Sequence, residues 1–168
     1  MGATHKKLGI DGESKFEGRG VSYCAVCDGY FFKDKTVAVI GGGNTAVTEA
    51  TYLSHICKRV FLIYRGDALK ADRVLVQKLE KSGNVKILYN TNVMKIDGDE
   101  KVKSVTLDDE KILKTDGVFV AVGLEPRTEC VKGFVKTDDN GYVIADETCQ
   151  TSVSGIFVAG DILSLIHI

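Results

Sequence analysis

The sequence predicts an α/β fold in which a parallel sheet is buried on both faces. Residues 37–40 and 60–64 are continuous apolar runs, and residues 44–57 between them carry apolar side chains at helical spacing. Strands covered on both faces read as continuous apolar runs, whereas amphipathic helices repeat every three or four residues. A strand–helix–strand order with a right-handed crossover makes the two strands parallel. Residues 37–64 therefore form a predicted βαβ unit.

Further elements extend this unit toward the C-terminus. Asp72 is placed to cap a helix that ends near Gly83, and residues 85–89 predict a third strand. Period-two alternation on both sides of the Asp97-Gly98 turn predicts an antiparallel hairpin, and the apolar run 117–123 predicts another buried strand. The core α/β domain is expected to cover about residues 6–125.

Composition excludes several classes of protein. Of the 168 residues, 44% are hydrophobic and 27% are charged, which is a globular balance. The formal net charge of −1 gives no electrostatic reason to bind nucleic acid or an acidic membrane surface. No apolar run approaches the roughly 20 residues that span a bilayer, and the first residues lack the apolar core of a signal peptide. We therefore expect a cytoplasmic protein.

A glycine-rich turn joins the first strand to its helix. The pattern Gly41-x-Gly43-x-x-Ala46 in this context is the dinucleotide-binding fingerprint. Gly41 permits a tight turn, Gly43 leaves room for a pyrophosphate, and Ala46 allows close helix–strand packing. The helix N-terminus offers free N–H groups to phosphates, so Asn44 and Thr45 join the candidate cofactor-binding residues. The alternative is a purely structural turn.

The end of the second strand favours NADP over NAD. NAD sites place an acid there for the ribose 2′-hydroxyl, whereas NADP sites place arginine. Here Arg65 follows Tyr64, and the first acid is Asp67, beyond Gly66. Arg65 and Lys70 are candidates to bind a 2′-phosphate by charge-assisted hydrogen bonds. The alternative is that both are ordinary solvated charges.

The cysteines point to redox chemistry. Cys24 and Cys27 have the C-x-x-C spacing of a disulfide that opens and closes, and Asp28 is placed to shuttle protons or to serve as a turn residue. A structural zinc site usually needs two more ligands, and the remaining cysteines and the three histidines show no such spacing. The three lone cysteines are expected to be small buried hydrophobic residues: Cys57, Cys130 and Cys149.

Three motifs in order resemble the low-molecular-weight thioredoxin reductases. They are residues 20–29 (Gly-Val-Ser-Tyr-Cys-Ala-Val-Cys-Asp-Gly), residues 37–46 (Val-Ala-Val-Ile-Gly-Gly-Gly-Asn-Thr-Ala) and residues 151–161 (Thr-Ser-Val-Ser-Gly-Ile-Phe-Val-Ala-Gly-Asp). The resemblance covers residues 2 to about 162. It implies a Rossmann-like three-layer FAD/NAD(P)-binding fold, with an FAD domain split in sequence around an NADPH domain.

The resemblance also implies an activity and its residues. Electrons would pass from NADPH through FAD to the disulfide and then to thioredoxin. Cys27 would be the flavin-facing thiol, Cys24 the interchange thiol and Asp28 the acid/base. Asp161, after Gly160, would hydrogen-bond the FAD ribityl chain. The resemblance further implies a homodimer in the full-length protein, and the near-neutral charge gives no reason to expect nucleic acid or a membrane as a partner.

The sequence departs from this family in three places. The 2′-phosphate clamp of the family reads His-Arg-Arg-x-x-x-Arg, whereas this chain has Tyr64, Arg65, Gly66 and Lys70. The N-terminal FAD half is missing, and residues 162–168 are unlike the family's continuation. We therefore expect an internal fragment without turnover of its own.

The expected boundaries follow from these departures. They are an FAD-domain remnant at 1–5, an NAD(P)H-binding domain with the C-x-x-C at 6–133, a second FAD-domain remnant at 134–162 and a tail at 163–168. Without their usual sheet, Ile156, Phe157 and Val158 are expected to be exposed or misplaced. Two alternatives remain: the flavoprotein component of an alkyl hydroperoxide reductase, which usually has Pro-His between its cysteines, and a dinucleotide sensor without turnover.

Overall fold

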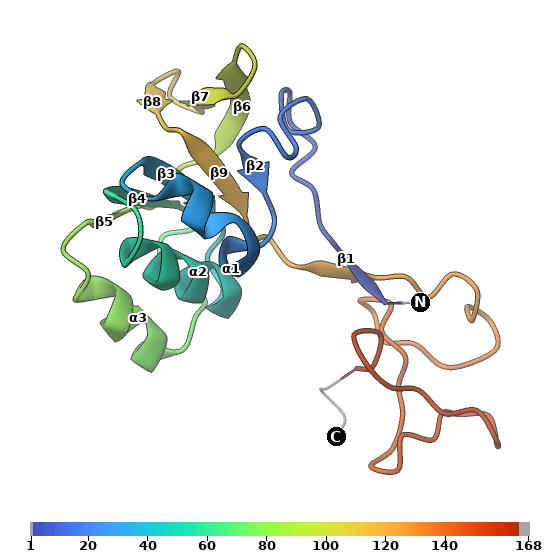
Figure 1. Ribbon diagram of the computed structural model, residues 1–168. Coiled ribbons are helices and arrows are strands. Elements are labelled where there is room, and N and C mark those ends of the chain that lie inside the picture. The colour runs from blue at the N-terminus through green and yellow to red at the C-terminus, as the bar shows by residue number, and fades with distance from the viewer. Residues whose placement is uncertain (1, 165–168) are drawn as a thin grey trace. The chain divides into compact units, whose positions relative to one another are not determined.

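The computed structural model describes residues 2–164 and divides the chain into two compact units. One unit is Lys7–Val122, and the other joins Met1–Lys6 to Gly123–Ile168 (Figure 1). The later segment of this second unit begins at Gly123, eleven residues before the start expected at residue 134. Of the expected tail at 163–168, residues 165–168 lie outside the described residues.

A parallel sheet forms the centre of the Lys7–Val122 unit. Its order is β2-β9-β3-β4-β5, and every neighbouring pair is parallel. The strands are β2 (Val21–Ser22), β3 (Thr36–Ile40), β4 (Arg59–Ile63), β5 (Val85–Leu88) and β9 (Gly117–Val120). This confirms the α/β fold and the parallel strands predicted from the apolar runs.

The helices of this unit are α1 (Ala25–Asp28), the 3₁₀-helix η1 (Gly29–Phe32), α2 (Asn44–Ser54) and α3 (Arg73–Glu80). Helix α2 ends three residues before the expected position 57, and Asn84 Nδ2 donates to the carbonyls of Ser54 and Cys57, both at 2.9 Å. Asp72 occupies the N-cap of α3, but its side chain makes no capping hydrogen bond. Its carboxylate accepts from Asn44 Nδ2 instead, at 3.0 Å.

An antiparallel sheet follows β5 in the chain. It contains β6 (Val93–Gly98), β7 (Val102–Leu107) and β8 (Ile112–Lys114) in that order, which confirms the antiparallel excursion. The turn expected at Asp97-Gly98 lies later, because β6 runs on to Gly98 through a register shift and the connection is residues 99–101. The short strand β8 was not predicted.

The parallel sheet is buried on both faces. Ala38 and Ile40 of β3 join a cluster with Val105 and other residues of β6 and β7, whereas Val37 and Val39 join a cluster with Leu53 of α2. Helices α2 and α3 therefore cover one face and the antiparallel sheet packs on the other, as Figure 1 shows. This three-layer arrangement explains why the strands read as continuous apolar runs.

The other unit is small and consists mainly of loops. Its strands β1 (Ala3–His5) and β10 (Leu124–Pro126) pair antiparallel. Ile156 and Phe157 are exposed as expected, but Val158 is buried in a local cluster with Val143, and its N–H donates to Cys149 O at 2.9 Å. The expectation was therefore wrong for Val158, because the segment forms a small core of its own. Within residues 2–164, no helix is long and apolar enough to cross a membrane.

Candidate functional site

The two cysteines of the C-x-x-C motif form a disulfide, as their spacing predicts. Their Cα atoms are 5.3 Å apart. Both cysteines follow the carboxyl end of β2, where Cys24 is the N-cap of α1 and its Sγ accepts from the Cys27 N–H at 3.2 Å. Cys24 is half-buried and Cys27 is exposed. The pair therefore lies at the edge of the parallel sheet, within reach of a partner.

Asp28 is oriented by a serine that sequence analysis did not identify. Ser22 Oγ donates to Asp28 Oδ2 at 2.6 Å and accepts from the Cys24 N–H at 3.1 Å. The Asp28 N–H in turn donates to Cys24 O at 3.1 Å. Ser22 thus links the carboxylate to the first cysteine, and its position two residues before Cys24 was the only available signal. The acid/base role of Asp28 stays a prediction.

A buried carboxyl group from α2 reaches the same short helix. Glu49 Oε1 accepts from the Ala25 N–H at 3.3 Å, while Oε2 is buried and has no hydrogen-bond partner among residues 2–164. Burial raises the pKa of Glu49, and the bond from Ala25 opposes that rise. Glu49 was not predicted as a site residue, although its place three residues after Ala46 and four before Leu53 puts it near the buried face of the helix.

The glycine-rich turn connects β3 to α2. Gly41 has φ +148°, and a Cβ on it would overlap the Ala121 carbonyl oxygen and lie 2.9 Å from the Ala46 Cβ. Gly43 is the N-cap of α2, and a Cβ on it would meet nothing within 4 Å. The turn therefore combines a tight approach at Gly41 and Ala46 with open space at Gly43, beside the exposed Thr45.

The segment after β4 is hydrogen-bonded to this turn. The Lys70 N–H donates to Gly42 O at 2.7 Å, and the Asp72 N–H donates to Asn44 Oδ1 at 2.8 Å. The ring of Tyr64 packs on Gly42, where it would overlap a Cβ. Lys70 therefore lies beside the glycine turn. The Asn44 side chain binds Asp72, so the backbone N–H of Asn44 is the group at the start of α2 that remains a candidate for a phosphate.

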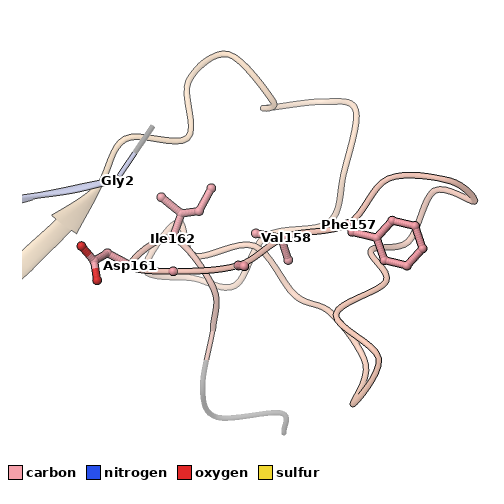
Figure 2. Close-up of a pocket in the computed structure, with 7 residues that line it drawn as sticks. Gly2, Phe157, Val158, Asp161 and Ile162 are labelled. Carbon is pink, nitrogen blue, oxygen red and sulfur yellow. The ribbon is translucent and has the colours of Figure 1, made fainter.

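The second group of candidates, Gly160 and Asp161, lies in the smaller unit. They line a cavity of about 360 Å³ together with Gly2 and residues 157–159 and 162. Figure 2 shows the Asp161 carboxylate at the end of this cavity near Gly2, with Phe157 at the other end. Gly160 has φ +81° and open space where a Cβ would be, so the backbone there is accessible to a ligand.

The lone cysteines differ from one another. Cys57 is buried as expected, and burial raises the pKa of its thiol to about 11. Cys130 is exposed and Cys149 is half-buried, so the expectation of three buried cysteines was wrong for these two. Both belong to the smaller unit, whose local core is too limited to enclose them.

Comparison with known proteins decides the family. The sequence model described as pyridine nucleotide-disulphide oxidoreductase matches residues 1–167. The chain belongs to this family. Among curated members, the thioredoxin reductase of Mycolicibacterium smegmatis is 43% identical over 97% of the chain and 54% of its own length. The thioredoxin reductase of Listeria innocua is 45% identical over 96% of the chain and 52% of its own length.

Solved structures of the family have the same fold. The Lactococcus lactis thioredoxin reductase matches with a TM-score of 0.86 and 39% identity, over 96% of this chain and 55% of that one. The T. acidophilum thioredoxin reductase matches with a TM-score of 0.88 and 42% identity, over 97% and 56%. These members confirm the resemblance to thioredoxin reductases. The chain spans about half the length of the family members it matches.

Proposed function

We propose that the chain is the NADPH-binding and disulfide-bearing part of a thioredoxin reductase. In this proposal electrons pass from NADPH through FAD to the Cys24–Cys27 disulfide and then to thioredoxin. The observation that carries the proposal is the disulfide on α1, which shares one compact unit with the glycine turn of a dinucleotide site. The similarity to thioredoxin reductases supports the same activity.

The residues of the turn fit NADPH. Gly43 and the first N–H groups of α2 would hold the pyrophosphate, because nothing fills the space in front of Gly43. Arg65 and Lys70 would bind the 2′-phosphate, and Lys70 is fastened beside the turn. NADPH supplies the hydride from which the electrons come.

Residues for FAD lie in the smaller unit. Gly160 and Asp161 line a cavity that is large enough for part of a cofactor, and Asp161 offers a carboxylate to a ribityl hydroxyl. FAD supplies the two-electron relay between NADPH and the disulfide.

The surface around the disulfide supports a protein partner. Val26 lies between the two cysteines, Tyr30 and Phe31 follow them, and the three side chains are 71%, 71% and 73% exposed. Large apolar side chains grouped on a surface are typical of protein–protein contacts. Thioredoxin would dock on these side chains and bring its own disulfide to the reduced cysteines.

The thiol–disulfide exchange needs no oxidant or reductant beyond the reduced cysteine pair and the thioredoxin disulfide. A thiolate of the reduced pair attacks one sulfur of the thioredoxin disulfide, which forms a mixed disulfide and releases a thioredoxin thiolate. The second cysteine of the pair then attacks the mixed disulfide, restores the Cys24–Cys27 bond and releases the second thioredoxin thiolate. Asp28, held by Ser22, would accept the proton of the attacking thiol and return one to the leaving thiolate.

A trapping experiment tests the function and assigns the two sulfurs. In a chain with Cys130 and Cys149 replaced by serine, Cys27→Ser leaves Cys24 free, and Cys24→Ser leaves Cys27 free. The probe is thioredoxin that lacks its resolving cysteine and carries thionitrobenzoate on the other. Since the proposal makes Cys24 the interchange thiol, Cys27→Ser should release thionitrobenzoate at least about tenfold faster than Cys24→Ser.

Release measured by absorbance decides among three outcomes. Faster release by Cys27→Ser would support Cys24 as the interchange thiol. Faster release by Cys24→Ser would assign that role to Cys27, which is the more exposed residue of the pair. Reaction of neither variant, while both react with a small disulfide, would remove thioredoxin as the partner.

A second experiment tests the cofactor. Arg65→Ala should weaken NADPH binding about tenfold, because one charge-assisted hydrogen bond to the 2′-phosphate is lost. NADH binding should stay unchanged, since NADH has no 2′-phosphate. Calorimetric titration of both cofactors measures the difference, and Lys58→Ala serves as an exposed control outside the turn. Equal losses for NADPH and NADH would remove Arg65 from the phosphate site.

A further inference from the structure

Glu49 connects the core helix α2 to the helix that carries the disulfide. Its Oε1 accepts from the Ala25 N–H at 3.3 Å, and this N–H belongs to the peptide group that follows Cys24. The chain approaches α2 closely at Gly29, the C-cap of α1, where a Cβ would lie 3.0 Å from Leu53 Cδ2 and 3.2 Å from Tyr52 Cε1. The packing of α1 on α2 therefore holds the carboxyl group against the backbone that carries the disulfide.

The second carboxyl oxygen of Glu49 makes no hydrogen bond to residues 2–164 in the oxidised protein. This atom, Oε2, is also buried. An ionised carboxylate with an unpaired buried oxygen is costly, whereas a neutral carboxyl group is less so. An amide or a hydroxyl group would satisfy Ala25 equally well. Glu49 therefore differs from a simple helix anchor in being able to gain and lose a proton.

Reduction of the disulfide would place a new negative charge on the segment that Glu49 contacts, because Glu49 accepts from the N–H that follows Cys24. The titratable and charged side chains on the elements packed against α2 are Cys27 and Asp28 of α1, Arg59 of β4, Arg73, Lys78 and Glu80 of α3, and Lys86 of β5. None of these side chains contributes to the pKa of Glu49 in the oxidised state, which burial raises and the Ala25 N–H lowers. A thiolate formed on α1 would thus be the charge that shifts the pKa of Glu49.

We propose that Glu49 is a positioning residue whose protonation is coupled to reduction of the Cys24–Cys27 disulfide. This inference rests on the proposed function, since it requires the disulfide to be redox-active. It adds to that function a second proton site on α2, separate from Asp28 on α1.

The coupling follows from charge balance. Two electrons from a dithiol break the S–S bond, and the two sulfurs become a thiol and a thiolate by taking up one proton. The thiolate repels an ionised Glu49, so the reduced chain holds the Glu49 proton more tightly than the oxidised chain does. Between the two pKa values of Glu49, reduction therefore takes up an additional fraction of a proton.

The sign of the effect on the disulfide follows from this linkage. Below both pKa values Glu49 is neutral in either state and has no charge effect. Above both values it is ionised in either state and disfavours the thiolate. Relative to a neutral residue at position 49, the equilibrium for reduction is therefore unchanged at low pH and becomes less favourable as pH rises through the Glu49 titration. A coupling of one pKa unit corresponds to about a tenfold change in that equilibrium.

The test compares the chain with its Glu49→Gln variant, in which the amide oxygen still accepts from Ala25. Each protein is equilibrated with reduced and oxidised dithiothreitol across a range of pH, and mass spectrometry after alkylation measures the reduced fraction of Cys24 and Cys27. The ratio of the two equilibrium constants, chain over variant, should fall about tenfold as pH rises. Glu80→Gln, an exposed control at the end of α3, should give a pH-independent ratio.

A measurement on the unaltered chain completes the test. Carboxyl ¹³C NMR follows the titration of Glu49, and its pKa should be higher in the reduced chain than in the oxidised chain. Equal pKa values in the two states, or a pH-independent ratio for Glu49→Gln, would overturn the inference. A disulfide that dithiothreitol does not reduce at all would instead overturn the proposed function.

Discussion

Gly41→Ala is expected to lower the free energy of unfolding by about 3 kcal/mol and to abolish NADPH binding. Residue 41 has φ +148°, a backbone conformation that costs a residue with a side chain about 1–3 kcal/mol. The added methyl group would also overlap the Ala121 carbonyl oxygen, which is backbone of the strand region after β9 and cannot rotate away. The turn would have to open, and the start of α2 would move with it.

Gly43→Ala is the matched control for this prediction. A Cβ at Gly43 meets nothing within 4 Å, and its φ of −94° suits any residue. Its stability should therefore stay within about 0.5 kcal/mol of the original chain, while NADPH binding weakens about tenfold because the methyl group enters the space for the pyrophosphate. Urea denaturation and calorimetric titration separate the two effects. Equal stability of the two variants would contradict the tight-turn argument.

Glu13→Ala should lower the free energy of unfolding by about 3 kcal/mol, because three hydrogen-bond donors lose their acceptor. Glu13 is only 1% exposed. Its carboxylate accepts from the Leu8 and Gly9 N–H groups at 2.9 and 2.8 Å, and from Tyr23 Oη at 3.0 Å. Burial and the bond to Glu13 raise the pKa of Tyr23, so the phenol stays protonated and keeps donating.

Two variants with smaller expected losses of stability serve as comparisons for Glu13→Ala. Tyr23→Phe removes one of the three donors together with its hydroxyl and should cost about 1 kcal/mol. Glu17→Ala removes an exposed carboxylate paired with Lys7 and should leave the urea midpoint unchanged. Since Tyr23 precedes Cys24, the Glu13→Ala variant should also make the disulfide more rapidly reducible by dithiothreitol. A loss for Glu13→Ala no larger than that for Tyr23→Phe would show that water replaces the carboxylate.

Much of the fold follows from local patterns. The strands β3, β4 and β9 were predictable because both their faces are buried, which leaves an uninterrupted apolar run. Residues before 36 contain no such run, and β1, β2, α1 and η1 are each two to four residues long. Elements of this length depend on their neighbours. Strand β2 exists because it pairs with β9, which lies almost a hundred residues later.

The residues of the candidate site likewise include some that local patterns predict and others that depend on packing. The C-x-x-C pair, the Gly41-x-Gly43-x-x-Ala46 turn and the candidate phosphate residues Arg65 and Lys70 could be predicted from the amino-acid order, because their chemistry depends on residue type and short spacing. The contacts of Ser22 with Asp28, Glu49 with Ala25 and Glu13 with Tyr23 became visible in the folded chain. These contacts arise where separate elements pack together. Whether a polar side chain is solvated or buried against a partner is decided by that packing and by the cost of leaving a buried polar group without a hydrogen bond.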